Sequence, residues 1–281
     1  LPKGALISHR AEIARMCALR LDCSITEKDA FVAWSPMFHM AATDQLLCAL
    51  MSGSTVIIID GLKLEEIVEA AKHHTLGWLV MLPGSIKPMI EYLKKNKPKL
   101  KSIACVGAMA DLVPRQEIAE LTELLDAPYL NSFGSTETGL PPASANLITP
   151  GNINYSLSKR LSSLCEIRLI DPEGIEVPDG EPGELAIRGP TVFSGYWNAP
   201  GTNKNDFTAG WFRMGDLFRR NENGSLDFVD RAKYMIKSGG ENIYPAEVEN
   251  ALMSHPQILD AAVVGVPDEK FGEEICAWIV L

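Results

Sequence analysis

The sequence contains none of the short cysteine or histidine patterns that indicate a metal site or a disulfide framework. Six cysteines are spread over 281 residues without a C-x-x-C pair, and the five histidines include no H-E-x-x-H spacing. Scattered cysteines in a chain of this size are typical of reduced thiols. They predict an intracellular protein that does not depend on disulfide bonds.

Positive charge is also scarce. The chain has 26 Lys and Arg against 36 Asp and Glu, and its formal net charge is −10. This balance disfavours nucleic acid and anionic membranes, which bind basic surfaces. It does not exclude a phosphorylated ligand, because backbone N–H groups and a metal ion can hold a phosphate locally.

Long hydrophobic runs are missing as well. The longest, such as residues 56–59 (Val-Ile-Ile-Ile), are too short to cross a bilayer. Residue 1 begins the string Leu-Pro-Lys-Gly, which has neither the charged nor the apolar part of a signal peptide. We expect a cytoplasmic protein without an integral membrane segment. The oligomeric state cannot be read from the sequence.

What is present up to residue 150 is an alternation of amphipathic helices and short apolar runs. Helices are predicted at 8–21, 41–51, 63–73, after Pro83 and at 114–125, and strands at 55–59, 77–82, 102–106 and 129–133, while residues 30–35 form a short apolar run. Ser8 is placed to cap the first helix, whose buried face is predicted to hold Ile13, Met16, Cys17 and Leu21. The run at 55–59 is predicted to be a buried strand. This alternation is typical of an α/β domain with a parallel sheet covered on both faces.

After residue 150 the pattern changes to short runs separated by turns. Strands are predicted at 166–170, 183–188 and 225–229, which favours a small β-barrel-like subdomain. After residue 232, a helix at 245–254 and two apolar runs at 261–266 and 275–281 indicate the start of a small α+β domain. The predicted division is therefore 1–150, 151–232 and 233–281.

The most informative motif is Asn-Ser-Phe-Gly-Ser-Thr-Glu-Thr-Gly at 131–139. It follows a predicted strand, at the sheet edge where α/β proteins bind ligands. Gly134 allows close approach of a ligand to the backbone, Thr136 offers a hydroxyl to a phosphate, and Glu137 is a hard oxygen ligand for Mg²⁺. By itself the string could also be a plain strand-to-loop turn, which is the less favoured alternative.

Two further strings complete a pattern. Residues 183–196 (Gly-Glu-Leu-Ala-Ile-Arg-Gly-Pro-Thr-Val-Phe-Ser-Gly-Tyr) lead to 211–217 (Trp-Phe-Arg-Met-Gly-Asp-Leu), and residues 230–249 contain Lys-Ser-Gly-Gly-Glu-Asn at 237–242. Each alone reads as a tight turn or a solvated linker. Together and in this order they resemble the adenylate-forming superfamily of acyl-CoA synthetases, luciferases and peptide-synthetase adenylation domains. The resemblance extends over essentially the whole chain.

The resemblance implies a nucleotide site. The residues that it assigns to ATP or AMP are Gly107, Ala108, Met109, Asn131, Ser132, Phe133, Gly134, Thr136, Asp216 and Arg231. Residues 107–109 resemble the segment on which adenine lies, and Phe133 replaces the usual tyrosine of the opposing wall. Asp216 and Arg231 would bind the ribose, and Glu137 would hold Mg²⁺. We expect Phe133, Glu137, Asp216 and Arg231 to meet in one cleft.

The resemblance also implies sites for the other two substrates. His39, after Phe38, matches an aromatic–histidine pair at the floor of the acyl pocket, although a satisfied interior histidine remains the alternative. Lys233 matches the hinge between domains, and Gly239, Gly240 and Glu241 match the channel for the pantetheine arm of CoA.

Some features depart from the superfamily pattern. Met214 stands where a threonine is usual, and residues 151–161 replace a Gly-Ser-x-Gly-x-Pro stretch. Only residues 1–4 match the phosphate loop, and no match to the late catalytic lysine is seen. These gaps predict a chain truncated at both ends, which binds its substrates better than it converts them.

The function expected is therefore that of an ATP-dependent acid–thiol ligase. It would adenylate a carboxylic acid with Mg²⁺ and ATP, release pyrophosphate, and transfer the acyl group to CoA. The alternatives are a carrier-protein thiol or molecular oxygen as acceptor, and a non-catalytic remnant that binds nucleotide or acyl groups. The identity of the acid is open, although Met40, Ala41, Ala42 and Met109 suggest an apolar one.

Overall fold

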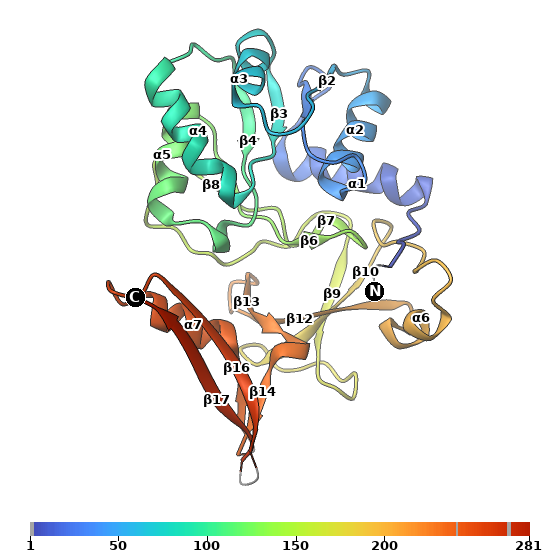
Figure 1. The fold of residues 1–281 in the computed structure, drawn as a ribbon. Coiled ribbons are helices and arrows are strands. Elements are labelled where there is room, and N and C mark those ends of the chain that lie inside the picture. Colours follow the sequence, from blue (N-terminus) through green and yellow to red (C-terminus); the bar gives the residue numbers. More distant parts are fainter. Residues whose placement is uncertain (1–2, 240, 269–270) are drawn as a thin grey trace. The chain divides into compact units, whose positions relative to one another are not determined.

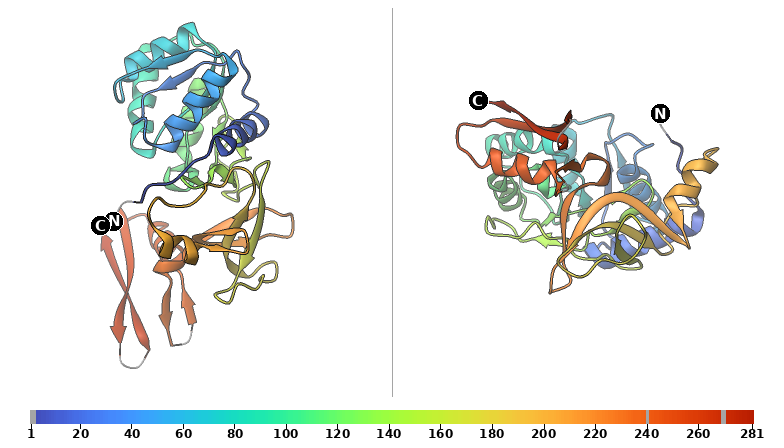
Figure 2. Two further views of the ribbon diagram at one scale, coloured as in Figure 1. Left: turned by 90° about the vertical axis from the view of Figure 1, so that its right-hand side faces the viewer. Right: turned by 90° about the horizontal axis from the view of Figure 1, so that it is seen from below.

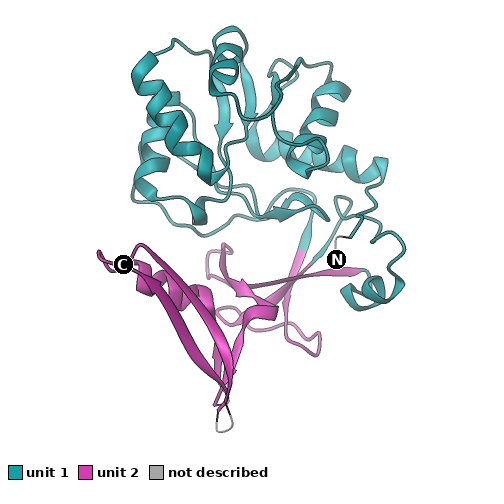
Figure 3. Ribbon diagram, in the orientation of Figure 1, with its two compact units in different colours: residues 1–166, 187–210 teal, residues 167–186, 211–281 magenta. Residues whose placement is uncertain are grey.

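A computed structural model describes residues 3–239, 241–268 and 271–281. The chain forms two compact units, which are coloured separately in Figure 3. Unit 1 comprises Leu1–Glu166 and Ile187–Gly210, and unit 2 comprises Ile167–Ala186 and Trp211–Leu281. The two units are interleaved along the chain, and the division at residues 150 and 232 stays a prediction.

Unit 1 contains the α/β architecture predicted from the sequence. Its helices are α1 (His9–Cys23), α2 (Met40–Ser52), α3 (Leu64–His73), α4 (Pro83–Asn96), α5 (Arg115–Leu125), α6 (Pro200–Asp206) and the 3-10 turn η1 (Ala110–Leu112). Its strands are β1 (Phe31–Ala33), β2 (Val56–Ile58), β3 (Leu76–Leu79), β4 (Ile103–Val106), β5 (Tyr129–Leu130), β6 (Gly134–Ser135), β7 (Gly139–Pro142), β8 (Leu147–Ile148) and β11 (Phe207–Thr208).

The central sheet of unit 1 has the order β3-β4-β5-β8. Its first three strands are parallel and β8 is antiparallel to β5, while β1 and β2 form a separate parallel pair. Helices α4 and α5 lie side by side along this sheet, and α1 packs with α2 (Figure 1). Parallel strands place their carboxyl ends at one edge, so the loops that follow β4 and β5 emerge together.

The core of unit 1 follows from the sequence periodicity. All four residues of β3 are buried, as expected for a strand covered on both faces. Helix α3 buries Ile67, Val68 and Ala71 on one face, and Pro83 occupies the first turn of α4. Burial of each such large aliphatic side chain contributes about 1.5–3 kcal/mol.

Two details of the prediction were wrong. Helix α1 does begin after Ser8, whose hydroxyl accepts from Ala11 N at 3.1 Å, but Ile13 and Leu21 are exposed. The helix instead buries Ala11, Ala14, Ala18 and Arg15, because small side chains permit close packing and the cation is paired. Strand β2 is not buried: it pairs only with β1, and Ile58 is 74% exposed.

Unit 2 consists of β-structure with one helix. Its elements are β9 (Glu166–Ile170), β10 (Pro182–Arg188), β12 (Trp211–Arg220), β13 (Leu226–Arg231), η2 (Ala232–Tyr234), β14 (Ile236–Ser238), β15 (Glu241–Ile243), α7 (Pro245–Met253), β16 (Asp260–Asp268) and β17 (Gly272–Val280). Strands β13, β12, β10 and β9 are neighbours in that order. The second sheet has the order β15-β14-β17-β16, and its β16–β17 hairpin forms the long twisted ribbon in Figure 2.

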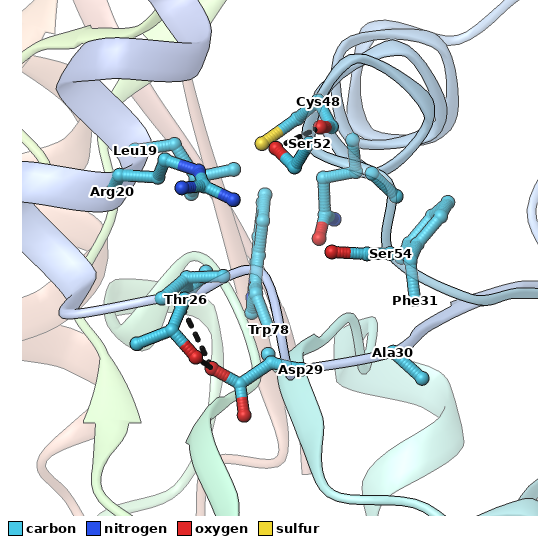
Figure 4. A pocket seen from close by; sticks show the side chains of 14 residues that line it. Leu19, Arg20, Thr26, Asp29, Ala30, Phe31, Cys48, Ser52, Ser54 and Trp78 are labelled. Atoms are coloured by element: carbon cyan, nitrogen blue, oxygen red, sulfur yellow. Dashed lines mark hydrogen bonds between the residues drawn. The ribbon is translucent and has the colours of Figure 1, made fainter.

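One small pocket lies near the amino ends of β1 and β3. Figure 4 shows its lining, which includes Arg20, Asp29, Cys48 and Trp78. The space open to the centre of a water molecule is about 20 Å³, which suits a water rather than an organic ligand. The loops of interest follow the carboxyl ends of the strands, at the opposite edge of the sheet.

The cysteines and helices agree with the composition. All six cysteines are free thiols, as predicted. Among the described residues, no helix combines the length and apolar character needed to cross a membrane.

Candidate functional site

The 131–139 motif forms a tight hairpin beyond the end of β5. Strands β6 and β7 pair antiparallel, and Thr138 secures the turn between them by donating to Pro141 O at 2.6 Å and accepting from Ser135 N at 3.2 Å. A Cβ atom on Gly134 would lie 2.1 Å from Gly139 O, so a glycine is required there. The tip presents Thr136 to solvent and leaves Glu137 half-buried.

Two residues of the segment that follows β10 donate hydrogen bonds to Glu137. Its backbone carbonyl accepts from Phe193 N at 2.8 Å, and its Oε1 accepts from the hydroxyl of Tyr196 at 2.5 Å. Tyr196 is only 5% exposed. Burial, and secondly the hydrogen bond to Glu137, raise the pKa of Tyr196, so its hydroxyl remains the donor.

Behind the same hairpin lies the buried side chain of Arg15. Its Nη2 donates to Thr136 O at 3.1 Å, its Nε donates to Thr191 O at 3.0 Å, and its Nη1 pairs with Asp44 at 3.3 Å. One guanidinium therefore ties helices α1 and α2 to both segments that flank Glu137. No motif or spacing in the sequence identifies Arg15. It lies in the pattern of an apolar helix face, and its charge is the only sign of a special role.

The segment after β4 is fixed by its backbone. Gly107 has φ +80°, and its carbonyl accepts from Trp78 Nε1 at 2.6 Å. The Tyr129 hydroxyl donates to Ala108 O at 2.8 Å. Met109 N donates to the hydroxyl of Ser132 at 3.2 Å. This last bond joins two segments of unit 1 that were predicted to belong to the nucleotide site, 107–109 and 131–134.

Below these segments lies a cation that the sequence analysis missed. Lys159 is fully buried and bonds to Asp111 and to Oδ1 of Asn131. The amide of Asn131 in turn donates to Leu157 O at 3.0 Å. The side chain of Asn131 thus holds the 157–159 segment. The only sign of Lys159 in the sequence is that it lies within residues 151–161, which depart from the superfamily pattern.

His39 does not lie in the interior. It is exposed at the start of α2, where its Nδ1 accepts from Ala41 N at 3.2 Å, and the preceding Phe38 is 88% exposed. The alternative of a satisfied interior histidine is therefore wrong. A contact of His39 with a bound acid stays a prediction.

Asp216 and Arg231 form a cross-strand pair within unit 2. They are partners in the register of β12 and β13, and Arg231 Nε lies 2.9 Å from Asp216 Oδ1. Asp216 is 4% exposed, whereas the side chain of Arg231 is 54% exposed. Beside them, Glu184 accepts from Gly215 N at 3.2 Å and from Arg213 Nε at 2.9 Å, which fixes the backbone next to Asp216.

The remaining predicted residues also belong to unit 2. Lys233 lies in the one-turn η2, exposed, with its ammonium 4.6 Å from the centre of the Tyr234 ring. Gly239 N donates to Phe271 O at 2.9 Å, and Glu241 is exposed at the start of β15. Gly240 lies outside the described residues. Because Phe133 and Glu137 belong to unit 1 and Asp216 and Arg231 to unit 2, their meeting at one nucleotide stays a prediction.

The donor set suits magnesium bound together with a nucleotide. The described residues contain no group of three or more His, Cys, Asp or Glu side chains that could hold a metal by themselves. Mg²⁺ typically binds through one or two carboxylates and substrate phosphates. Glu137 fits this pattern: Tyr196 occupies Oε1, and no described residue donates to Oε2.

Two family models match the chain. The model described as AMP-binding enzyme matches residues 1–197, and that of the AMP-binding enzyme C-terminal domain matches residues 247–281.

Among the curated relatives, the indoleacetate–CoA ligase of Aromatoleum aromaticum is 32% identical over 99% of this chain and 54% of its own length. The 2-succinylbenzoate–CoA ligase of Bacillus subtilis is 29% identical over 100% of this chain and 56% of its own length. The chain thus spans about half the length of the curated relatives it matches.

Solved structures agree in fold. The o-succinylbenzoate coenzyme A synthetase of Bacillus subtilis, in complex with ATP and magnesium ion, superposes with a TM-score of 0.82 at 27% identity, covering 100% of this chain and 57% of that one. An amide bond synthetase from Marinactinospora thermotolerans gives a TM-score of 0.82 at 26% identity, covering 99% and 57%.

Proposed function

Because the chain belongs to the AMP-binding enzyme family, we propose that the protein is an ATP-dependent acid–thiol ligase of the acyl-CoA synthetase type. It activates a carboxylic acid as its adenylate with release of pyrophosphate, and the CoA thiol then displaces AMP to form the thioester. The CoA ligases among its relatives support this proposal. The need for ATP and CoA favours a cytoplasmic location.

The observation that carries the proposal is the arrangement around Ser132. Its hydroxyl links residues 107–109 to the strand end that leads, four residues later, to the exposed Thr136 and the half-buried Glu137. The segment proposed to carry the base, and the two side chains proposed to bind phosphate and metal, thus follow neighbouring strands. This is the arrangement that a bound Mg-ATP requires.

The first step joins two anions, so catalysis depends on neutralising charge and aligning the reactants. Magnesium, when bound, would neutralise phosphate charge. Glu137 would hold that ion, Thr136 would donate to a phosphate oxygen, and Met109 and Phe133 would enclose the base. In unit 2, Asp216 offers two acceptor oxygens to the ribose hydroxyls, and Arg231 is a donor to the same sugar.

The second step needs a thiol to reach the acyl carbon. We assign this change to rotation about Lys233, which brings Gly239, Gly240 and Glu241 to the pantetheine arm of CoA. Small residues leave room for a thin substrate, and boundary residues such as Lys233 commonly act as hinges. His39 would border the acyl pocket. The acid itself is open among fatty, aryl and small branched acids.

The test uses the full-length protein and a panel of carboxylic acids, scored by pyrophosphate release with and without CoA. We expect one class of acid to release pyrophosphate on addition of ATP and Mg²⁺, and the product to be a CoA thioester. If pyrophosphate release is followed by transfer of the acyl group to an amine or to a carrier-protein thiol, that group is the acceptor in place of CoA. If the protein binds ATP but no acid gives pyrophosphate, the proposed reaction is wrong and the protein is a binding remnant.

A further inference from the structure

The hydroxyl group of Tyr196 lies against the carboxylate predicted to bind magnesium. The bond from Tyr196 Oη to Glu137 Oε1 is 2.5 Å long, and it connects residues 59 positions apart. Tyr196 ends the string at 183–196, to which the proposed function gives no role. Charge-assisted hydrogen bonds of this kind are about twice as strong as neutral ones.

Contacts that do not involve Glu137 fix both the backbone and the ring of Tyr196. Asn203 accepts from Tyr196 N at 2.7 Å and donates to Tyr196 O at 3.0 Å. The ring of Phe193 packs edge to face at 4.8 Å between centroids. The ammonium group of Lys3 lies 3.8 Å from the centre of the Tyr196 ring, with Asp206 at 3.9 Å. The Tyr196 hydroxyl is therefore a hydrogen-bond donor held in place independently of Glu137.

Without this bond only the backbone of Glu137 would be fixed. Phe193 N holds its carbonyl at 2.8 Å, and Arg15 holds the carbonyl of Thr136 at 3.1 Å. Neither contact acts on the side-chain torsions of Glu137. Its carboxylate has two oxygen atoms, and Oε1 alone is engaged by a described residue. The tyrosine thus fixes the orientation of the carboxylate, whose second oxygen no described residue engages.

We propose that Tyr196 is a positioning residue, whose hydroxyl holds Oε1 of Glu137 and thereby presents Oε2 to the magnesium ion of Mg-ATP. This inference rests on the proposed function. A carboxylate held in this way binds the ion through one oxygen and loses no side-chain freedom when the ion arrives. Such preorganisation increases affinity without adding a contact.

The test is ATP binding by titration calorimetry, once with Mg²⁺ and once with EDTA. We expect Tyr196→Phe to reduce the tightening caused by Mg²⁺ by about tenfold, the effect of losing a hydrogen bond to a charged group. Binding in EDTA should not change. The control is Tyr155→Phe, which removes a buried hydroxyl for which the described residues offer no partner. That variant should match the wild type in both buffers.

Glu137→Gln separates failure of the inference from failure of the proposed function. If Glu137→Gln keeps the full effect of Mg²⁺, its metal role is wrong and the inference is overturned with it. If Glu137→Gln loses the effect and Tyr196→Phe keeps it, only the positioning role is overturned. The double variant should bind no more weakly than Glu137→Gln alone, because both changes act on one contact. An additional loss in the double variant would contradict the inference.

Discussion

The guanidinium group of Arg15 donates a hydrogen bond of 3.1 Å to the backbone carbonyl of Thr136, 121 residues away in the sequence. The same group donates to Thr191 O at 3.0 Å. Its side chain is 2% exposed and is paired with Asp44. The buried side chain of Arg15 therefore supports both the backbone at Thr136, next to Glu137, and the backbone at Thr191.

Replacing Arg15 should destabilise the protein strongly. At about pH 8, above the Asp44 pKa of about 7, Arg15→Leu leaves the Asp44 carboxylate buried without its cation, and breaking a buried pair in this way costs about 3–5 kcal/mol. The measurement is the free energy of unfolding in urea. Arg10→Leu, at an exposed position of the same helix, is the matched control and should change stability by no more than about 0.5 kcal/mol. Equal losses in the two variants would show that the Arg15 contacts carry no special weight.

Asp44 should make stability depend on pH. Burial raises the pKa of Asp44 to about 7 from 3.8, against the opposing effect of Arg15 and together with the nearby Glu12. The folded state then holds a proton that the unfolded state has lost between about pH 4 and pH 7. This contribution to stability is present below that window and is lost as the pH rises through it.

Asp44→Asn isolates this contribution, because the amide does not titrate. We expect the stability of the wild type, relative to Asp44→Asn, to fall between about pH 4 and pH 7 in urea unfolding. Asp60→Asn removes an exposed carboxylate and should give a difference that hardly varies with pH. A constant difference for Asp44→Asn as well would show that the carboxyl titrates normally.

Gly107 should tolerate no side chain. Its φ of +80° disfavours other residues, and a Cβ atom would lie 2.1 Å from the ring of Tyr129. Gly107→Ala should reduce the free energy of unfolding by about 3 kcal/mol, from overpacking together with backbone strain. Gly84→Ala, where a Cβ meets nothing within 4 Å, is the control and should be neutral or slightly stabilising. Similar stability for both variants would contradict the packing argument.

Local signals predicted much of the fold. The cap at Ser8, the helix after Pro83, the helix within residues 63–73 and the helix that begins at residue 245 lie where the sequence placed them. Each depends only on residues within one or two turns. By contrast, β12 was not predicted as a strand, because Trp211–Arg220 mixes charged and apolar residues whose partners lie on other strands.

The supports of the candidate site could not be predicted for the same reason. Arg15, Lys159 and Tyr196 act on residues 121, 28 and 59 positions away. No local pattern encodes such pairs. The resemblance identified Thr136 and Glu137 as a motif, but a motif does not specify the side chains that hold it. The wrong prediction of the buried face of α1 has the same cause. Helix α1 buries Arg15, and Ile13 and Leu21 therefore face solvent.

Lys233→Pro should separate the two half-reactions of the proposed ligase. A proline in η2 restricts the backbone torsions that a rotation at this position needs. We expect thioester formation to slow by about tenfold or more in single-turnover assays, while pyrophosphate release changes by less than about threefold. Lys233→Ala keeps the backbone free and should behave like the wild type. Equal losses in both half-reactions would refute the hinge assignment.

Asp216 should affect nucleotide affinity and leave the choice of acid unchanged. Its Oδ1 is engaged by Arg231 at 2.9 Å and its backbone is set by Glu184, so the carboxylate is preorganised before a sugar binds. Asp216→Ala removes an ionised acceptor, a loss of about tenfold or more in ATP affinity by calorimetry. The ribose belongs to ATP and is the same whichever acid is activated, so relative rates across the acid panel should stay constant. Asp227→Ala, on the same β12–β13 hairpin, is the matched control and should bind ATP normally. Unchanged ATP affinity in a folded Asp216→Ala protein would remove Asp216 from the ribose site, whereas altered acid preference would place it beside the acyl group.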